Sequence, residues 1–186
     1  MFEKYFIKPE ELILVITDIQ EKLINAMKED IAEKVIKNTI TLIELSKLFN
    51  IPIILTEQYP KGLGQTVEKI RKVLSYYEPI EKITFSSFLE PKFAESIQRL
   101  NRTKVIITGM ETHICVWQTS LDLLLNGYTV FVIKDAVCSR KKIDWKTGLE
   151  LIKSAGGIIT TTEILVFQIL KKAGTGEFKK ILKFVK

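Results

Sequence analysis

Short apolar runs alternate with amphipathic stretches along the whole chain. The runs are Leu12–Ile16, Ile53–Leu55, Val105–Ile107 and Val130–Ile133, with shorter candidates at 79–83 and 158–160. β-Branched residues are frequent in them and both faces are apolar, which is typical of parallel strands covered on both sides. The pattern therefore predicts the central strands of a sheet.

Helical periodicity fills the gaps between these runs. Apolar residues recur at spacings of three, four and seven from Ile31 to Phe49, which predicts one amphipathic helix. Further helices are expected after Pro91, after Asp144 as the N-cap of residues 145–154, and over residues 178–185. Strands that alternate with helices predict an α/β fold with right-handed crossovers and a mostly parallel sheet.

Composition narrows the class of protein. The chain has 186 residues, 46% hydrophobic and 27% charged, which suits one domain over residues 1–186 with its own core. No apolar run approaches the roughly 20 residues of a membrane span, and Met1–Glu11 lacks the order of a secretory signal. Two cysteines fit a reducing compartment, so we expect a cytoplasmic protein with no membrane partner.

The net charge of +6 allows two interpretations. It could attract nucleic acid or an anionic substrate, or it could reflect a solvated surface rich in Lys and Glu. The lysines are scattered and are not interleaved with aromatic residues, which favours the solvated surface. We therefore expect no nucleic-acid partner.

Polar residues follow the predicted strands at the edge where parallel α/β sheets bind ligands. Asp18 ends the first run, and a carboxylate just past a buried strand is poorly solvated and can act as a base. Alone, it could equally be a turn or capping residue. Lys82, near the end of 79–83, could be a fixed positive charge or an ordinary surface lysine.

Cys115 lies where the segment Thr108–Cys115 leads from a strand into helical periodicity. With Thr112 as the N-cap, Cys115 falls in the first helical turn, where the helix dipole stabilises a thiolate and lowers the pKa of the thiol. The alternative is a buried, inert cysteine. Together with Asp18 and Lys82, Cys115 would give one sheet edge a nucleophile, a base and a cation.

Other chemistry has little support in the sequence. Cys138 also follows a strand, but no candidate base lies near it, so we interpret it as structural. One His and no Cys pair at ligand spacing argue against a zinc site. Neither a GxGxxG motif nor a P-loop is present. We predict no metal and no cofactor.

Three motifs, in order and at strand ends, identify a family resemblance. They are Leu14–Gln20, Glu81–Lys82 followed by Phe85–Ser86, and Thr108–Val116 continued by Thr119 and Leu121–Leu124. The chain resembles the isochorismatase-like cysteine hydrolases over nearly its whole length. The stretch Thr56–Gly64 is similar to the branch called isochorismatase domain-containing proteins.

The resemblance implies a three-layer Rossmann-like fold, with a central, mainly parallel six-stranded sheet and helices on both faces. It also implies a homo-oligomer, since relatives are often dimers or larger. The residues that it implies for the site are a catalytic set of Asp18, Lys82 and Cys115, and a cis peptide between Met110 and Glu111 with the amides of Glu111 and Cys115 as an oxyanion hole. Gln20, Tyr59 and Phe88 are close to these motifs and are predicted to bind substrate.

Members of the family hydrolyse nicotinamide, carbamoyl amines, ureido compounds or the vinyl ether of isochorismate. Zinc-binding nicotinamidases have an Asp-x-His motif and a further His after the second strand, where this chain has Glu57–Pro60 without His. Cys115 favours covalent hydrolysis of a small amide or ureido C–N bond over vinyl-ether hydrolysis. Two rival hypotheses are a non-catalytic binding protein that keeps the fold, and a redox pair of Cys115 and Cys138.

Overall fold

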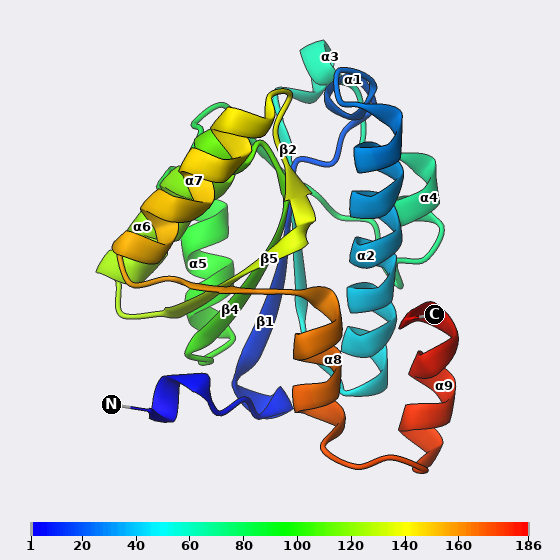
Figure 1. Cartoon of the computed structure of the whole chain (residues 1–186). Helices are drawn as coiled ribbons and strands as arrows, with labels where there is room; N and C mark the ends of the chain where they lie inside the picture. The colour runs from blue at the N-terminus through cyan, green and yellow to red at the C-terminus, as the bar shows by residue number, and fades with distance from the viewer. Residues whose placement is uncertain (1, 186) are drawn as a thin grey trace.

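The computed structural model describes residues 2–185, so Met1 and Lys186, the ends of the predicted domain, lie outside it. Six strands form one sheet in the order β3-β2-β1-β4-β5-β6, and all pairings between neighbouring strands are parallel (Figure 1). This confirms the predicted fold class. The strands are β1 Leu12–Thr17, β2 Ile53–Gln58, β3 Ile80–Lys82, β4 Lys104–Met110, β5 Thr129–Cys138 and β6 Ile158–Thr160.

Helices connect the strands. The α-helices are α1 Glu21–Asn25, α2 Glu29–Leu48, α3 Pro60–Leu63, α4 Glu68–Arg71, α5 Pro91–Arg99, α6 Trp117–Leu125, α7 Lys142–Ser154, α8 Thr162–Leu170 and α9 Gly176–Val185. Short 3-10 turns lie at η1 Glu3–Tyr5, η2 Pro9–Glu11 and η3 Ser87–Leu89, and a single π-helical turn, η4, spans Thr112–Val116. Within residues 2–185, no helix has the length and apolarity that crossing a membrane requires.

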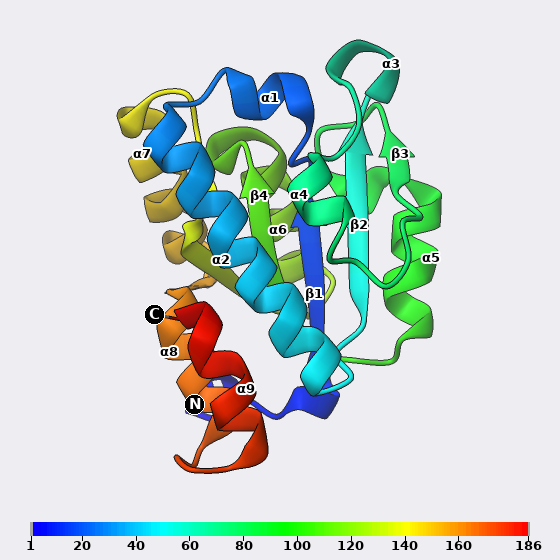
Figure 2. The ribbon, with the colours of Figure 1, turned by 90° about the vertical axis from the view of Figure 1, so that its right-hand side faces the viewer.

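The two faces of the sheet bury separate cores, as the continuous apolar runs predicted. In β1, Leu12, Leu14 and Ile16 pack with α2, α8 and α9, whereas Ile13 and Val15 pack with α5, α6 and α7. Figure 1 shows these helices on opposite sides of the sheet, and Figure 2 shows α2 crossing its front face. The strand needs apolar residues at every position because both neighbouring layers are helical.

Several element boundaries differ from the prediction. Helix α7 begins at Lys142 with Lys141 as N-cap, so Asp144 lies in its first turn and does not cap it. Helix α8 was not predicted, because its sequence is apolar on nearly all sides and has no clear polar face. Strand β5 is longer than Val130–Ile133, since it continues past Lys134 and pairs again with the end of β4 after a register shift.

Candidate active site

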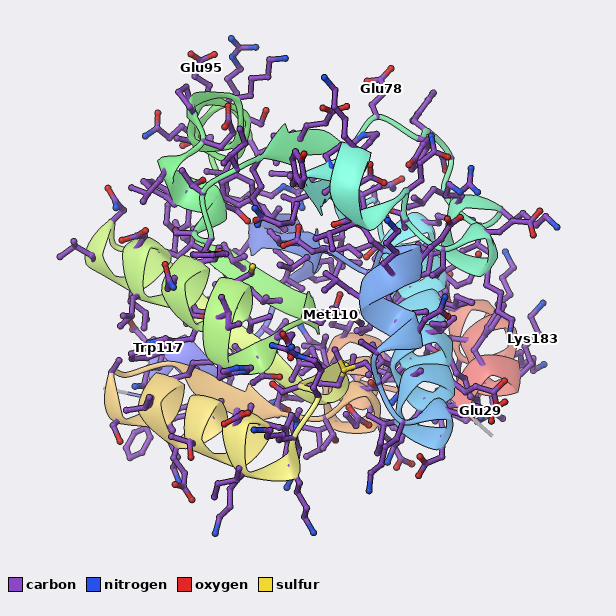
Figure 3. The ribbon with its side chains drawn as sticks, turned by 90° about the horizontal axis from the view of Figure 1, so that it is seen from above. Glu29, Glu78, Glu95, Met110, Trp117 and Lys183 are labelled. Atoms are coloured by element: carbon purple, nitrogen blue, oxygen red, sulfur yellow. The ribbon has the colours of Figure 1, made fainter. Side chains whose placement is uncertain are left out.

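Asp18, Lys82 and Cys115 all lie at the carboxyl edge of the sheet. Asp18 follows β1, Lys82 is the last residue of β3, and Cys115 lies in η4, just after β4. Figure 3 looks down on this edge, with Met110 at the end of β4 near the centre of the view. Parallel strands bring their carboxyl ends together, which is why residues so far apart in the sequence meet here.

Lys82 and Asp18 form an ion pair with no exposed side-chain surface, 2.7 Å from Nζ to Oδ2. Lys82 reaches across β2 to make this contact. Its Nζ also donates to Gln58 Oε1 at 2.7 Å and to the carbonyl oxygens of Thr84 and Phe85 at 3.3 Å. Within residues 2–185, Asp18 Oδ2 accepts no hydrogen bond of standard geometry. The contact is therefore an ion pair by distance and charge, and Oδ2 keeps a lone pair for another proton.

The backbone aims the Asp18 carboxylate. Asp18 has φ of 51°, in the left-handed region that costs a non-glycine residue about 1–3 kcal/mol. Its Oδ1 accepts a hydrogen bond from Thr56 Oγ1 at 2.7 Å, and its N–H donates to the Thr56 carbonyl at 3.2 Å. Residues on β2 therefore hold the carboxylate that follows β1.

Cys115 lies in a wider turn than predicted. Glu111, rather than Thr112, precedes the turn as its N-cap, and η4 is π-helical before α6 begins at Trp117. The Glu111 carbonyl accepts hydrogen bonds from the N–H groups of Ile114 and Val116, at 3.0 and 3.2 Å. Single π-helical turns are often found at functional sites.

The predicted lowering of the Cys115 pKa is wrong. Burial, followed by the Asp18 charge, raises the pKa of the Cys115 thiol to about 12, and Lys82 only partly offsets this. The charges of both Asp18 and Lys82 therefore act on the Cys115 thiol. In the resting protein Cys115 is therefore a neutral thiol beside a buried ion pair, and it needs a base to become a nucleophile.

The turn before Cys115 has an unusual backbone conformation and a close backbone contact. The Met110–Glu111 peptide bond is cis, at the position where the family resemblance implied one. Gly109 has φ of 108°, and a Cβ built there would lie 1.9 Å from the Thr17 carbonyl oxygen. The Glu111 N–H has no acceptor within residues 2–185, while its carboxylate accepts from the N–H and Nε of Arg140 at 3.0 and 3.1 Å.

The three predicted substrate-binding residues have different surroundings. Gln20 is buried, and its amide bonds to the backbone of Gln58 and to the Gly64 carbonyl. Tyr59 is exposed, and its ring lies 2.4 Å from where a Cβ at Gly62 would be. Phe88 packs edge-on against Phe93 and Tyr128. Gln20 thus braces the loop 58–64, Phe88 packs against the core on the α5 side, and Tyr59 is the most exposed of the three.

Two polar residues of the site were missed by the sequence reasoning. Thr56 and Gln58 lie on the same face of β2, and they hold Asp18 and Lys82 respectively. Gln58 stands opposite Lys82 in the parallel register. Their alternation at the end of a buried strand was a signal that could have found them.

Neither Glu57 nor Cys138 provides a second reactive centre. The Glu57 carboxylate accepts from the N–H and hydroxyl of Thr66 and from the Tyr77 hydroxyl. Cys138 is 1% exposed, and burial, followed by the Glu111 charge, raises its pKa to about 12. No group of three or more His, Cys, Asp or Glu within residues 2–185 could hold a metal.

Known sequences are similar to this chain over most of its length. The family model described as the Isochorismatase domain matches residues 12–164. The mouse protein named isochorismatase domain-containing protein 2A is 33% identical over 183 residues, which cover 97% of this chain and 85% of the relative.

Solved structures agree. A structure of MAR1 ribonuclease from Caenorhabditis elegans superposes with a TM-score of 0.88 at 34% identity, covering 96% of this chain and 91% of the other. The YcaC gene product of Escherichia coli, described as an octameric hydrolase of unknown specificity, has a TM-score of 0.87 at 20% identity, with 96% and 89% covered. At that identity the second likeness concerns the fold alone.

Proposed function

Because this chain belongs to the isochorismatase family, whose fold is that of a hydrolase, we propose that it is a cysteine-dependent hydrolase of small amide or ureido compounds. The observation that carries the proposal is a buried thiol, Cys115, whose pKa is shifted by both charges of the buried Asp18–Lys82 ion pair at the same sheet edge. A structural protein has no need of a buried ion pair beside a thiol, since such pairs contribute little net stability.

In this mechanism Asp18 takes the proton of the Cys115 thiol. The thiolate then attacks the carbonyl carbon of the substrate and a C–S bond forms. Asp18 gives the proton to the leaving nitrogen as the C–N bond breaks, which leaves a thioester on Cys115. Asp18 next deprotonates a water that attacks this thioester, and the C–S bond breaks with return of the proton to sulfur. Lys82 keeps the carboxylate oriented and stabilises its charged form.

Negative charge develops on the substrate oxygen during both attacks. We assign its stabilisation to the amides of Glu111 and Cys115, and the unpaired state of the Glu111 N–H supports this choice. The loss of one such donor typically costs about 10²–10³-fold in rate. We propose that Gln20, Tyr59 and Phe88 shape the substrate pocket. Gln20 would do so by holding the loop that carries Tyr59, and Phe88 by supporting the core beside that loop.

The test measures the release of ammonia from a panel of small amides and ureido compounds. Cys115→Ser should lower the rate by at least about 10³-fold, because catalytic residues that act as a unit fail together. Cys138→Ser is the matched control, since it removes the other buried thiol, which the mechanism does not use. Equal activity in Cys115→Ser and the parent would refute the proposal.

The same panel separates the rival functions. It includes a vinyl ether and an RNA, because vinyl-ether hydrolysis is the main rival and the Caenorhabditis elegans relative is described as a ribonuclease. Turnover of the vinyl ether that survives Cys115→Ser would identify protonation without a covalent intermediate. Binding of a panel member without turnover would indicate a non-catalytic protein. Loss of activity under oxidation that needs both Cys115 and Cys138 would indicate the redox pair.

We also propose that the protein works in the cytoplasm as a homo-oligomer. The Escherichia coli protein that shares this fold is described as an octamer, which shows that the fold can assemble. Large apolar side chains after β3 support it too, since Ile83 is 80% exposed and Leu89 is 62% exposed. Light scattering coupled to size exclusion should give a mass above that of one chain, and a monomer at all concentrations would contradict it.

A further inference from the structure

A cavity opens at the carboxyl edge of the sheet, between the first turns of α2 and α7 and the end of β5. Its volume is about 400 Å³, and Asp18, Lys82 and Cys115 are not among the residues that line it. Figure 1 shows that both helices begin at the upper edge of the sheet, on opposite sides of it. The volume lies in the range of small-molecule sites.

Positive charge dominates this α2–α7 cavity. Two carboxylates line it, and one of them, Asp135, already accepts two hydrogen bonds from Thr162. Arg140 shares its charge with Glu111, and Lys134 lies over the Trp145 ring. The cationic residues of the lining are Lys28, Lys34, Lys134, Arg140 and Lys142. Lys28, Lys34 and Lys142 form no ion pair within residues 2–185, so their charges are available to a ligand.

Both helices present their positive ends to the cavity. Helix α2 follows Lys28 and α7 follows Lys141, and neither N-cap side chain makes a capping hydrogen bond. The first N–H groups of a helix therefore keep their hydrogen-bonding capacity, and the dipole favours an anion there. Two helix N-termini and a lysine-rich lining therefore face the same cavity, and Ser139 adds a hydroxyl group to it.

The remaining wall is apolar, made by Ile31, Val35, Val137 and Trp145. A bare inorganic ion would leave this wall in contact with water, whereas a ligand with an apolar body would cover it. From these features we infer that the α2–α7 cavity binds a small organic anion, a carboxylate or phosphate joined to an apolar or aromatic body, at a site separate from Cys115.

Calorimetric titration with four probes tests this inference without reference to turnover, so its outcome does not depend on the proposed hydrolysis. Benzoate and phenyl phosphate have both required features, inorganic phosphate has only the charge, and benzyl alcohol has only the apolar body. We expect benzoate or phenyl phosphate to bind more tightly than either of the other two. Which of these two binds better distinguishes a carboxylate ligand from a phosphate ligand.

Variants locate the bound anion. Lys34→Gln/Lys142→Gln should weaken binding by about ten- to a hundredfold, as expected for lost hydrogen bonds to a charged group. Lys179→Gln/Lys180→Gln, which removes the same charge from exposed positions of α9, should leave it unchanged. Cys115→Ala should also bind normally. Equal affinity for benzyl alcohol and benzoate, or for the Lys34/Lys142 variant and the parent, would overturn the inference, and weakening by Cys115→Ala alone would place the anion at Cys115 instead.

Discussion

Replacing Lys82 by methionine should destabilise the protein far more than replacing both members of the Asp18–Lys82 pair. The two side chains have no exposed surface, and 2.7 Å separates their charges. Lys82→Met keeps the volume but leaves a buried carboxylate without its cation, and breaking a buried pair in this way costs about 3–5 kcal/mol. Three oxygen acceptors, on Gln58, Thr84 and Phe85, also lose their donor.

The partner variant is Asp18→Asn. Asn tolerates the left-handed conformation that Asp18 adopts, and its side-chain oxygen can still accept from Thr56. Lys82 keeps its three oxygen acceptors in this variant, so the loss of stability should be smaller than in Lys82→Met. In the double variant Asp18→Asn/Lys82→Met neither charge remains, and most of the loss should be recovered.

Urea unfolding followed by circular dichroism measures these differences as shifts in midpoint at a constant slope. The double-mutant cycle should give a coupling energy of about 2–3 kcal/mol. Losses that simply add, or a Lys82→Met variant within about 1 kcal/mol of the parent, would refute the argument that burial makes the two charges interdependent.

Further predictions concern the thiols and the turn before Cys115. Asp18→Asn removes a charge that raises the Cys115 pKa, so Cys115 should react faster with iodoacetamide at pH 8 while hydrolysis is lost, and slower alkylation would contradict this. The pKa values of Cys115 and Cys138 are raised from 9.0 to about 12 and that of Tyr77 from 10.0 to about 12. As the pH rises, the unfolded chain therefore loses these protons at a lower pH than the folded protein does. The free energy of unfolding should fall as the pH rises above 9. In urea unfolding at several pH values this fall should be shallower in Cys138→Ser, and an unchanged slope would contradict the assignment. Gly109→Ala should cost about 3 kcal/mol or more, because it adds a clash to a positive φ. Gly127→Ala, with φ of 84° and nothing within 4 Å, should cost less in the same assay, and equal losses would show that the clash is relieved.

The order of elements could be predicted because each strand is buried on both faces. Residues 12–16 are apolar at every position, as a strand between two helical layers must be. Helix α8 could not be predicted, since tertiary packing rather than an amphipathic pattern buries it. The end of β5 was missed because Lys134 and Asp135 interrupt its apolar run, and only its pairing with β4 extends the strand.

Some features of the candidate site could likewise be predicted from the sequence, and others could not. Asp18, Lys82 and Cys115 could be located because each follows a predicted strand. The Cys115 pKa could not be foreseen, since burial and the neighbouring Asp18 outweigh any effect of the helix end. The part played by Gln58 depends on the register of β2 with β3, which a sequence does not fix.

Cys138 has a practical consequence for measuring motion in this protein. Its side chain is 1% exposed at the end of β5, and its neighbour in the register is Met110, next to the turn that carries Cys115. Cys138 borders the α2–α7 cavity but its sulfur is almost fully covered, so a bulky reagent reaches it only when the structure around that cavity opens, and the rate of its modification reports the free energy of that opening. In Cys115→Ser, Cys138 is the one remaining thiol of the sequence. The variant made to abolish catalysis is therefore also a native sensor of local unfolding beside the site, with no added label.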